Sequence, residues 1–351
     1  MRLDAHNTNG RAGIDVTRAA IRDVAVRAGV SVATVSRVLN DRPDVSPSTR
    51  AAVQRHMKEL GYVGNRRARA LASGRTGLVG LTVPYMTDDY FAALMMGAAE
   101  ALYERDARLV VCPTLHEHDR EVSLLDHLKQ GLTDGGLLVA PSESGAELAA
   151  LYRQGYPFVV IDSGVPLAEG IPVVAAANWA GARTATEHLI ALGHRRIAAL
   201  TGPPSWSANV DRLAGYHSAL VAAGLPIVPE MVRDADFAID GGYKAAQHLL
   251  SLADRPTAIF AFNDKMAFGA LRAARERGLD IPGHLSVVGF DDIELASLVT
   301  PELTTIRQPL KEMGRVAASV LYRLLDGQPL DATRVELSTK LVTRASTGSP
   351  P

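Results

Sequence analysis

The sequence predicts an all-α helix-turn-helix head joined to an α/β body made of two doubly wound subdomains. Three observations lead to this prediction. Short helical patterns with caps fill residues 19–63, apolar runs alternate with amphipathic stretches from Gly77 onward, and basic residues concentrate before residue 77. At 351 residues, with 47% apolar and 21% charged, the chain has room for two or three domains and a sizeable core.

Caps and apolar spacing define the three helices of the head. Apolar side chains recur at helical spacing over 21–28, and Gly29 follows as a C-terminal cap. Ser31 can cap a second helix, and Ser46 precedes a proline that suits the first position of a third helix, which Gly61 ends. A tight turn between the first two helices is typical of a helix-turn-helix module, although a three-helix cap on a larger fold has the same periodicity.

Charge favours DNA as the partner of this head. Residues 1–76 contain 14 Lys and Arg against 6 Asp and Glu, a net charge of +8, whereas the rest of the chain carries −9. The whole-chain charge of −1 hides this asymmetry. A basic head on an acidic body indicates that only the head meets a polyanion. The Arg-rich segment 64–76 is either a solvated linker or a hinge that folds when its charges meet phosphate.

Strand-like and helix-like patterns alternate through the body. Continuous Val, Ile and Leu runs are typical of parallel strands that helices cover on both faces, and this alternation predicts two doubly wound units. The expected strands are the runs LVGLTVPY, RLVVCPT, GGLLVAPS, PFVVIDS, IPVVAAAN, RIAALTGP, TAIFAFND and LSVVGFDD. The expected helices lie near 90–105, 119–131, 146–155, 180–192, 211–224, 241–253 and 265–277.

Polar residues follow three of these strands, and they are Asp162, Asn263, Asp264, Asp291 and Asp292. Ligands of open parallel sheets bind beyond the carboxyl ends of the strands, where these residues lie. Carboxylates and carboxamides there suit a polyhydroxylated ligand, because each can bind two neighbouring hydroxyl groups. The alternative is helix capping, which favours the same residue types at the same positions. In the polar loop GPPSWSANVDR, Trp206 can stack on a sugar ring or fill a domain or dimer interface.

Other candidate sites lack the residues that metal binding or catalysis requires. His116 and His118 resemble a metal pair without a visible third ligand, so we expect no metal. Cys112 lies inside an apolar run, where an inert buried thiol is expected, and a single cysteine suits a reducing compartment. No hydrolase, protease or phosphate-binding motif occurs, no apolar run approaches the length of a membrane helix, and the first residues lack an export signal. We therefore expect a cytoplasmic non-enzyme that needs no cofactor and no membrane.

The head closely resembles the DNA-binding domain of LacI/GalR-family transcriptional regulators. This resemblance rests on the run from Ile21 to Asn40, on Val45-Ser46 with Thr49-Arg50, on Gly61-Tyr62, and on the hinge-like ARAL at 68–71. The body resembles the effector domain of the same family, which is similar to periplasmic sugar-binding proteins. Its matching motifs are DRLAGY at 211–216, FND at 262–264, VVGFDD at 287–292 and LTTIRQ at 303–308. Ala20 and Ala177 depart from the family's usual threonine and acidic residues.

The resemblance implies how the head binds DNA. Val32, Ala33 and Arg37 take the positions that read bases in the major groove, where Arg37 can contact guanine through two hydrogen bonds. Ala68 and Leu71 take the hinge positions, from which the leucine enters the minor groove and bends the duplex. The positions implied for contacts to the DNA backbone are Ser31, Thr34, Ser36, Asn40, Ser46, Thr49 and Tyr62.

The resemblance also implies an effector cleft in the body. Its matched positions are Tyr90, Phe91, Asp162, Trp206, Arg212, Phe237, Asn263 and Asp291, with Gln308 in a crossover between the subdomains. The aromatic side chains would stack on the face of the ligand, and the polar ones would hold its hydroxyl groups. Arg212 is one charged donor among several acceptors, which favours a neutral sugar over a phosphate or a nucleobase.

The domain organisation follows from these patterns. We expect a flexible leader (1–18), a helix-turn-helix DNA-binding domain (19–63), a hinge (64–76), an effector-binding and dimerisation domain (77–345) and a tail (346–351). Within the body, the N-subdomain takes about 77–175 and 306–335, and the C-subdomain about 176–305 and 336–345.

These expectations combine into a homodimeric transcription regulator. We expect a repressor that binds a palindromic double-stranded DNA operator and responds to a small sugar-like effector between the subdomains. No heptad repeat for a tetramerising coil follows Arg344, which favours a dimer. The alternatives are a regulator controlled by a protein co-effector and a solute-binding protein that shares the α/β body. The basic head and the missing export signal argue against the second alternative.

Overall fold

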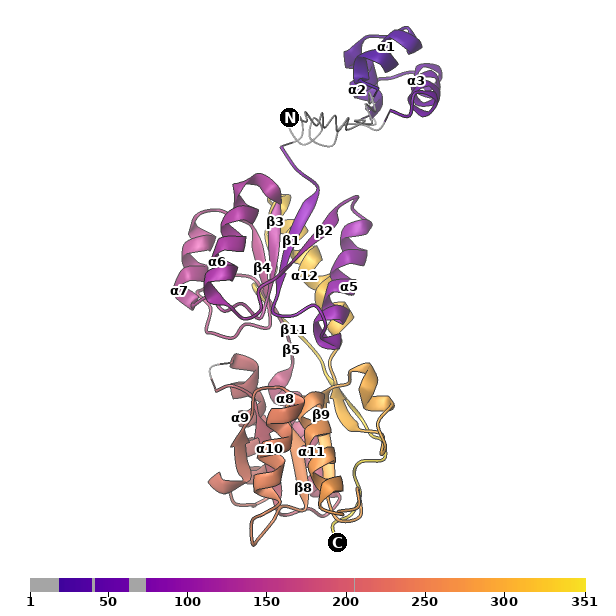
Figure 1. Ribbon diagram of the computed structural model, residues 1–351. Coiled ribbons are helices and arrows are strands. Elements are labelled where there is room, and N and C mark those ends of the chain that lie inside the picture. Colours follow the sequence, from indigo (N-terminus) through magenta and orange to yellow (C-terminus); the bar gives the residue numbers. More distant parts are fainter. Residues whose placement is uncertain (1–18, 40–41, 63–73, 205) are drawn as a thin grey trace, which may run out of the picture. The chain divides into compact units, whose positions relative to one another are not determined.

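The computed structural model describes residues 19–39, 42–62, 74–204 and 206–351, and Figure 1 shows its helices and strands. Contacts within the chain separate two compact units, one ending at Arg75 and the other beginning at Thr76. The described part of the first unit is helical, and the second unit is built from two parallel or mixed sheets with covering helices.

Three helices pack together in the first unit, and they are α1 (Ile21–Ala28), α2 (Val32–Leu39) and α3 (Pro47–Glu59). Gly29 follows α1 in the left-handed region at φ 66°, which lets the chain turn directly toward α2. Their common core consists of the buried side chains Val24, Ala25, Val35, Val38 and Val53. The helix-turn-helix head predicted from the sequence is confirmed.

Short polar side chains hold the first turns of these helices. Ser31 Oγ accepts a hydrogen bond at 3.1 Å from the backbone N–H three residues later, and Ser46 Oγ does the same at 3.2 Å. Ala20 has no side-chain acceptor to offer at the start of α1. Asp23 compensates in part, since its Oδ2 accepts from the backbone N–H of Ala20 at 2.7 Å.

The first sheet of the second unit has the strand order β11-β5-β4-β3-β1-β2, and all of its pairs are parallel. Its strands are β1 (Leu78–Val83), β2 (Arg108–Pro113), β3 (Gly135–Val139), β4 (Phe158–Ile161), β5 (Val173–Ala176) and β11 (Arg334–Leu337). Its helices are α5 (Asp89–Tyr103), α6 (His118–His127), α7 (Gly145–Arg153) and α12 (Leu310–Leu325). Helices α5 and α12 cover one face and α6 and α7 the other, and we call this assembly the N-subdomain.

The second sheet has the strand order β12-β10-β9-β8-β6-β7, and only β12 runs antiparallel to its neighbour. Its strands are β6 (Ile197–Thr201), β7 (Val232–Asp234), β8 (Ala258–Ala261), β9 (Ser286–Asp291), β10 (Thr304–Arg307) and β12 (Lys340–Val342). Its helices are α8 (Asn178–Ala191), α9 (Ser207–Ala222), α10 (Ile239–Leu249) and α11 (Asp264–Glu276). Helices α8 and α9 pack together, as do α10 and α11, and we call this assembly the C-subdomain.

Short connecting elements complete the second unit. They are the π-helical turn η1 (Leu128–Leu132) and the 3-10 turns η2 (Pro229–Met231) and η3 (Glu294–Ser297). The α/β body of two doubly wound subdomains predicted from the sequence is confirmed, and each of the eight apolar runs contains a strand. Four strands and one helix were not expected, namely β7, β10, β11, β12 and α12. These strands are only three or four residues long, and β11 alternates between exposed and half-buried side chains.

The subdomain boundaries differ from those expected near 306 and 335. The chain crosses between the sheets after β5, after β10 and after β11. Ile306 and Arg307 pair with β9 and therefore belong to the C-subdomain, whereas Glu336 and Leu337 pair with β5 in the N-subdomain. Three crossovers thus join the two subdomains.

The segment 346–351, expected as a tail, packs on the C-subdomain instead. Ser346 is fully buried, and its Oγ accepts from Thr304 N at 2.8 Å and donates to the carbonyl of Val287 at 2.6 Å. Buried His194 lies 2.9 Å from the carbonyl oxygen of Gly348. The boundary at 345 is therefore corrected, because the residues beyond it fill hydrogen-bonding positions beside β9 and β10.

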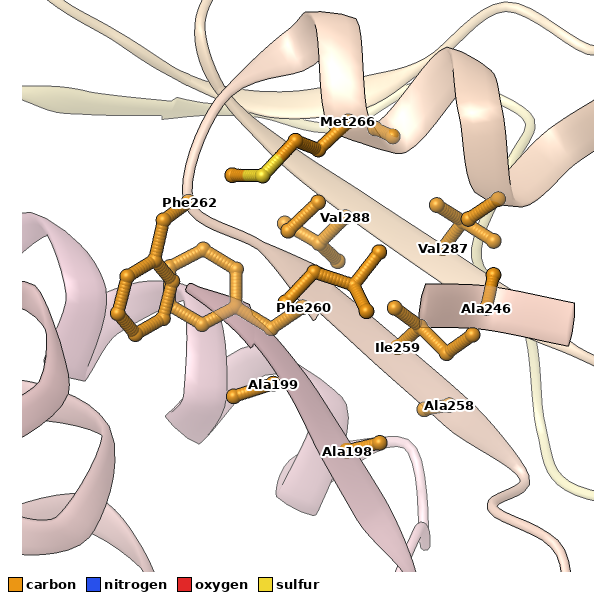
Figure 2. Packing of buried hydrophobic residues seen from close by; sticks show 14 of the residues in the cluster. Ala198, Ala199, Ala246, Ala258, Ile259, Phe260, Phe262, Met266, Val287 and Val288 are labelled. Atoms are coloured by element: carbon orange, nitrogen blue, oxygen red, sulfur yellow. The ribbon is translucent and has the colours of Figure 1, made fainter. Parts of the chain in front are cut away.

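The core of the C-subdomain combines aromatic and very small side chains (Figure 2). Phe260 lies on β8 and Phe262 just after its end, with their ring centroids 5.0 Å apart, and Met266 lies in the same cluster. Neighbouring positions such as Ala198 and Ala246 have small side chains, which let helices approach the sheet closely. This core fixes the end of β8, from which cavity-lining residues described below extend.

The close approach of α10 and α11 generates a test of this packing. A Cβ on Gly269 of α11 would lie 2.3 Å from the carbonyl oxygen of Ile239 and 2.4 Å from the nitrogen of Tyr243. We expect Gly269→Ala to lower the free energy of unfolding in urea by about 1–3 kcal/mol, despite the better helix propensity of alanine. The matched control is Gly164→Ala, whose Cβ would meet only Pro141 O at 3.7 Å. Equal unfolding curves for the two variants would contradict this account.

Candidate functional site

The carboxyl ends of strands from both sheets of the second unit face a cavity of about 920 Å³. Such a volume lies within the range of about 300–1,000 Å³ that is usual for small-molecule sites. Eight sequence-predicted positions line it: Tyr90, Phe91, Asp162, Trp206, Arg212, Phe237, Asn263 and Asp291. Gln308 does not line it but lies behind Asp291. The structure therefore brings together, from distant parts of the chain, the set that the resemblance implies.

Arg212 is a buried cation that donates two hydrogen bonds within the protein. Its Nε donates to Asn178 Oδ1 at 2.8 Å, and one terminal nitrogen donates to the carbonyl oxygen of Phe262. The guanidinium lies 3.8 Å from the ring centroid of Phe290 and 3.9 Å from Asp291 Oδ1. Burial lowers the pKa of Arg212, and the surrounding carboxylates counteract this. Arg212 thus fixes the floor of the cavity, a role that its sequence position alone did not indicate.

Asp162 presents an unsatisfied acceptor in the cavity. Its Oδ2 accepts a hydrogen bond from the hydroxyl of Tyr90, whereas its buried Oδ1 has no hydrogen-bond partner among the described residues. Burial raises the pKa of Asp162 to about 6, although the nearby Arg212 cation lowers it. A buried carboxylate oxygen without a donor is costly, so a ligand hydroxyl that donates to it would bind favourably.

Asp291 and Gln308 form a second buried acceptor group. Gln308 Nε2 donates to Asp291 Oδ1 at 2.6 Å, and Gln308 lies in the crossover between β10 and α12. Burial raises the pKa of Asp291 to about 7, against the opposing effects of Arg212 and Gln308. Gln308 therefore supports a cavity residue from behind instead of lining the cavity itself.

The remaining polar residues at the strand ends divide between capping and ion pairing. Asn263 caps α11 by accepting from Met266 N at 2.8 Å, and its amide also donates to the carbonyl of Phe237 at 2.9 Å. Buried Asp264 accepts from the backbone N–H of Ile293 at 2.9 Å. Asp292 forms ion pairs with arginines outside the cavity. The capping alternative thus applies to Asn263, although this residue also lines the cavity.

Aromatic rings from both subdomains meet at the cavity. Tyr85 and His116 come from the N-subdomain, and their ring centroids lie 5.4 Å apart. His116 lies 5.5 Å from Trp206 of the C-subdomain, which in turn lies 5.5 Å from Phe237. Burial lowers the pKa of His116, with a smaller opposing effect from Glu121. Trp206, which the sequence left between ligand stacking and interface filling, lines the cavity.

Unusual backbone conformations gather at the same place. Non-glycine residues with positive φ that line the cavity are His116, Ala140, Asp162, Phe237 and Asp291. Each such conformation costs on the order of 1–3 kcal/mol and persists only where its surroundings impose it. The ring of one of them, Phe237, packs so closely on Gly202 that a Cβ there would overlap it. Concentrated strain of this kind is typical of binding sites.

Sequence reasoning missed four charged residues of the cavity, which are Asp88, Asp236, Asp240 and Lys265. Lys265 of α11 and Asp88, the N-cap of α5, both line it, and Lys265 Nζ lies 2.5 Å from Asp88 Oδ2. The expectation of Arg212 as one charged donor is therefore corrected. Lys265 follows the FND motif directly, which was a usable signal, but nothing in the sequence connects it with a residue 177 positions earlier.

In the head, α2 separates a buried face from an exposed one. Val35 and Val38 are buried, whereas Val32, Ala33 and Arg37 are exposed. Arg37 makes a 3.7 Å ion pair with Asp44 in which both side chains remain more than half exposed. The three base-reading candidates are therefore available to a partner.

The candidates for backbone contacts also serve the ends of the helices. Ser31 bonds to Thr34, and Ser46 bonds to Thr49, so that these four side chains lie at the starts of α2 and α3. Ser36 is half-buried on α2, and Tyr62 packs against the core of the head. Asn40, Ala68 and Leu71 lie outside the described residues, as do the leader and most of the hinge.

The residues that the structure describes include no group of three or more His, Cys, Asp or Glu side chains arranged to hold a metal ion. They also include no helix long and apolar enough to cross a membrane. His116, which the sequence paired with His118, contributes to the aromatic wall of the cavity.

Known proteins resemble this chain in both units. Residues 20–65 match the lacI family of bacterial regulatory proteins, and residues 186–347 match a periplasmic binding protein-like domain. The chain is 38% identical over 339 residues to the HTH-type transcriptional regulator CelR of Thermobifida fusca, an alignment that covers 94% of this chain and 98% of that protein.

Two solved structures are similar to this chain over nearly its whole length. A CelR–cellobiose complex matches with a TM-score of 0.71 at 37% identity, covering 94% of this chain and all of that chain. The lac repressor dimer bound to operator and the anti-inducer ONPF matches with a TM-score of 0.83 at 31% identity, covering 95% of this chain and all of that chain. These relatives are transcriptional regulators and not enzymes. The chain belongs to the lacI family of bacterial regulatory proteins.

Proposed function

We propose that this protein is a cytoplasmic transcriptional repressor that binds a palindromic double-stranded DNA operator as a homodimer and responds to a sugar-like effector in the cavity. The single observation that carries the effector assignment is the buried Asp162 carboxylate, whose Oδ1 has no donor among the described residues and belongs to a cavity with aromatic walls. A ligand that combines hydroxyl donors with apolar C–H faces satisfies both features, and a sugar has this chemistry.

The exposed face of α2 supports the DNA half of the proposal. Arg37 has a long, exposed side chain that can make two hydrogen bonds to a guanine edge, while Val32 and Ala33 offer apolar contact to a thymine methyl group. Ser31 and Ser46, at helix N-termini, are placed for phosphate contacts that set the register. The similar structure of the lac repressor is a dimer bound both to operator DNA and to the small molecule ONPF, an anti-inducer.

Exposed apolar side chains support the dimer. On α5, Met96 and Tyr103 are 56% and 69% exposed, although the same helix buries Phe91 and Leu94 against the sheet. Met96 and Tyr103 are seven positions apart and therefore lie on the same face of the helix, and exposed apolar patches are typical of protein interfaces. Two chains related by a two-fold axis would present two heads to the two halves of a palindrome.

Replacing Arg37 tests the DNA interface. We expect Arg37→Ala to weaken binding by about 1–3 kcal/mol to the duplex that wild-type protein selects from randomised palindromes, because a base contact is lost. Fluorescence anisotropy measures the affinity, and the stoichiometry should be two chains per duplex. The control is Arg55→Ala on α3, where Arg55 lies 4.0 Å from Glu59. If both variants bound the selected duplex as wild type does, Arg37 would not read a base.

Replacing Trp206 tests the effector site. In calorimetry against a panel of sugars that includes cellobiose and ribose, we expect Trp206→Ala to weaken the binding sugar by about 0.5–1.5 kcal/mol, since a stacking surface is lost. Trp179→Ala is the matched control, because Trp179 lies on α8, is 42% exposed and does not line the cavity. No heat with any sugar would instead favour control by a protein co-effector.

The raised pKa of Asp162 predicts a pH dependence of effector affinity. Hydroxyl donors favour the charged carboxylate, so binding lowers the pKa of Asp162 from about 6 and releases protons. Affinity should therefore fall as the pH drops below about 6, by up to roughly tenfold per pH unit, and hold steady with respect to this group above it. Calorimetry at pH 5.0, 6.0 and 7.5 provides the measurement. The same pH profile in Asp162→Asn would assign the effect to another group, such as Asp291.

A further inference from the structure

One ion pair joins the two subdomains across the cavity. Asp88 stands at the start of α5 in the N-subdomain, and Lys265 stands in the first turn of α11 in the C-subdomain. Lys265 Nζ lies 2.5 Å from Asp88 Oδ2, and the side chains are 34% and 17% exposed. Both residues line the cavity. A ligand in the cavity would therefore lie beside this pair.

Each charge of the pair is carried by a well-fixed helix end. Asp88 uses a different oxygen, Oδ1, to cap α5 by accepting from Tyr90 N at 3.1 Å. On the other side, the neighbour of Lys265, Asp264, is fully buried and accepts from Ile293 N and Thr305 Oγ1. Because both helix ends are anchored, the two charges stay within reach of each other for as long as the subdomains keep this relative orientation.

A second contact spans the same cavity. The ring centroids of His116 and Trp206 lie 5.5 Å apart, and they too belong to different subdomains. In the part of the chain that the structure describes, three crossovers connect the subdomains covalently, after β5, β10 and β11. Two bodies joined by short crossovers can change their relative orientation about them. Contacts between the bodies then form in one orientation and are lost in another.

We propose that Asp88 and Lys265 are positioning residues for the two subdomains. Their ion pair holds the subdomains in the orientation of this structure, which we call closed and which effector binding requires. The His116–Trp206 contact forms in the same closed orientation. This proposal rests on the proposed function, because it concerns regulation at the same cavity. The ion pair stabilises only the closed orientation, so it shifts the population that binds effector. The partial burial of both groups limits screening by solvent and salt.

Two substitutions remove the ion pair with little other change. Asp88→Asn keeps an oxygen that can cap α5 but removes the charge, and Lys265→Met keeps the length of the aliphatic side chain. In calorimetry with cellobiose and ribose as probes, each single variant should bind roughly three- to tenfold more weakly than wild type. The double variant should be no weaker than either single variant, because the second substitution removes a pair that is already broken. Lys244→Met, at an exposed position on α10, is the control.

Fluorescence of Trp206 measures closure without any effector. In a Trp179→Phe background Trp206 is the sole tryptophan, since the chain has two. Loss of its contact with His116 and of its partly buried setting should move its emission to longer wavelength in Lys265→Met, and small-angle scattering should show a larger radius of gyration. Circular dichroism checks that the fold is intact, and Lys265→Gln provides a second neutral variant if Lys265→Met does not fold.

The outcomes separate this proposal from the proposed function. A red-shifted emission with non-additive losses of affinity supports the positioning role. Additive losses, or an unchanged Trp206 emission and radius of gyration in both neutral variants, overturn it. If neither cellobiose nor ribose binds wild type, the sugar assignment fails for these probes, and the fluorescence and scattering of the free protein still decide whether the ion pair holds the subdomains together.

Discussion

The buried guanidinium of Arg212 is the constraint on which the rest of the cavity depends. An unpaired charge is costly in a protein interior, and the carboxylates of Asp162, Asp264 and Asp291 are buried nearby. Arg212 bonds to Asn178 at the start of α8 and to the chain after β8, and its guanidinium stacks on a ring of β9. Its own helix, α9, is thereby fixed to three other elements. The floor of the cavity is consequently set by charge compensation as much as by apolar packing.

This constraint also decides which groups remain for a ligand. Because Arg212 donates within the protein and Asn263 both caps α11 and bonds to Phe237, neither has its full capacity for a ligand. Asp162 differs, since one of its oxygens lacks a donor among the described residues. An acceptor-rich floor with aromatic walls selects hydroxyl donors over anions. Fewer polar groups are therefore free to bind a ligand than the number of polar residues in the cavity indicates.

The sequence predicted the elements better than the contacts between them. Long apolar runs, such as the one containing β9, predict buried strands. Strand β12 has only three residues, and it forms its hydrogen bonds with β10, which lies far away in the sequence. Site residues at strand ends were predictable because parallel strands share one edge for ligands. The pairing of Asp88 with Lys265 was not, since it depends on how two subdomains meet. Likewise, Gln308 acts through Asp291, which only the fold reveals.

The floor and the wall of the cavity differ in how far their side chains are committed to hydrogen bonds within the protein. Arg212 and Asn263 hydrogen-bond to buried groups of the protein, so a substitution of either residue would leave those groups without a hydrogen-bond partner. Trp206 differs, because the contacts described for its side chain are with the rings of His116 and Phe237 and not with buried polar groups. A substitution there changes the stacking surface and leaves the buried charges satisfied. A substitution in the wall can thus change ligand preference while the hydrogen bonds of the floor stay the same.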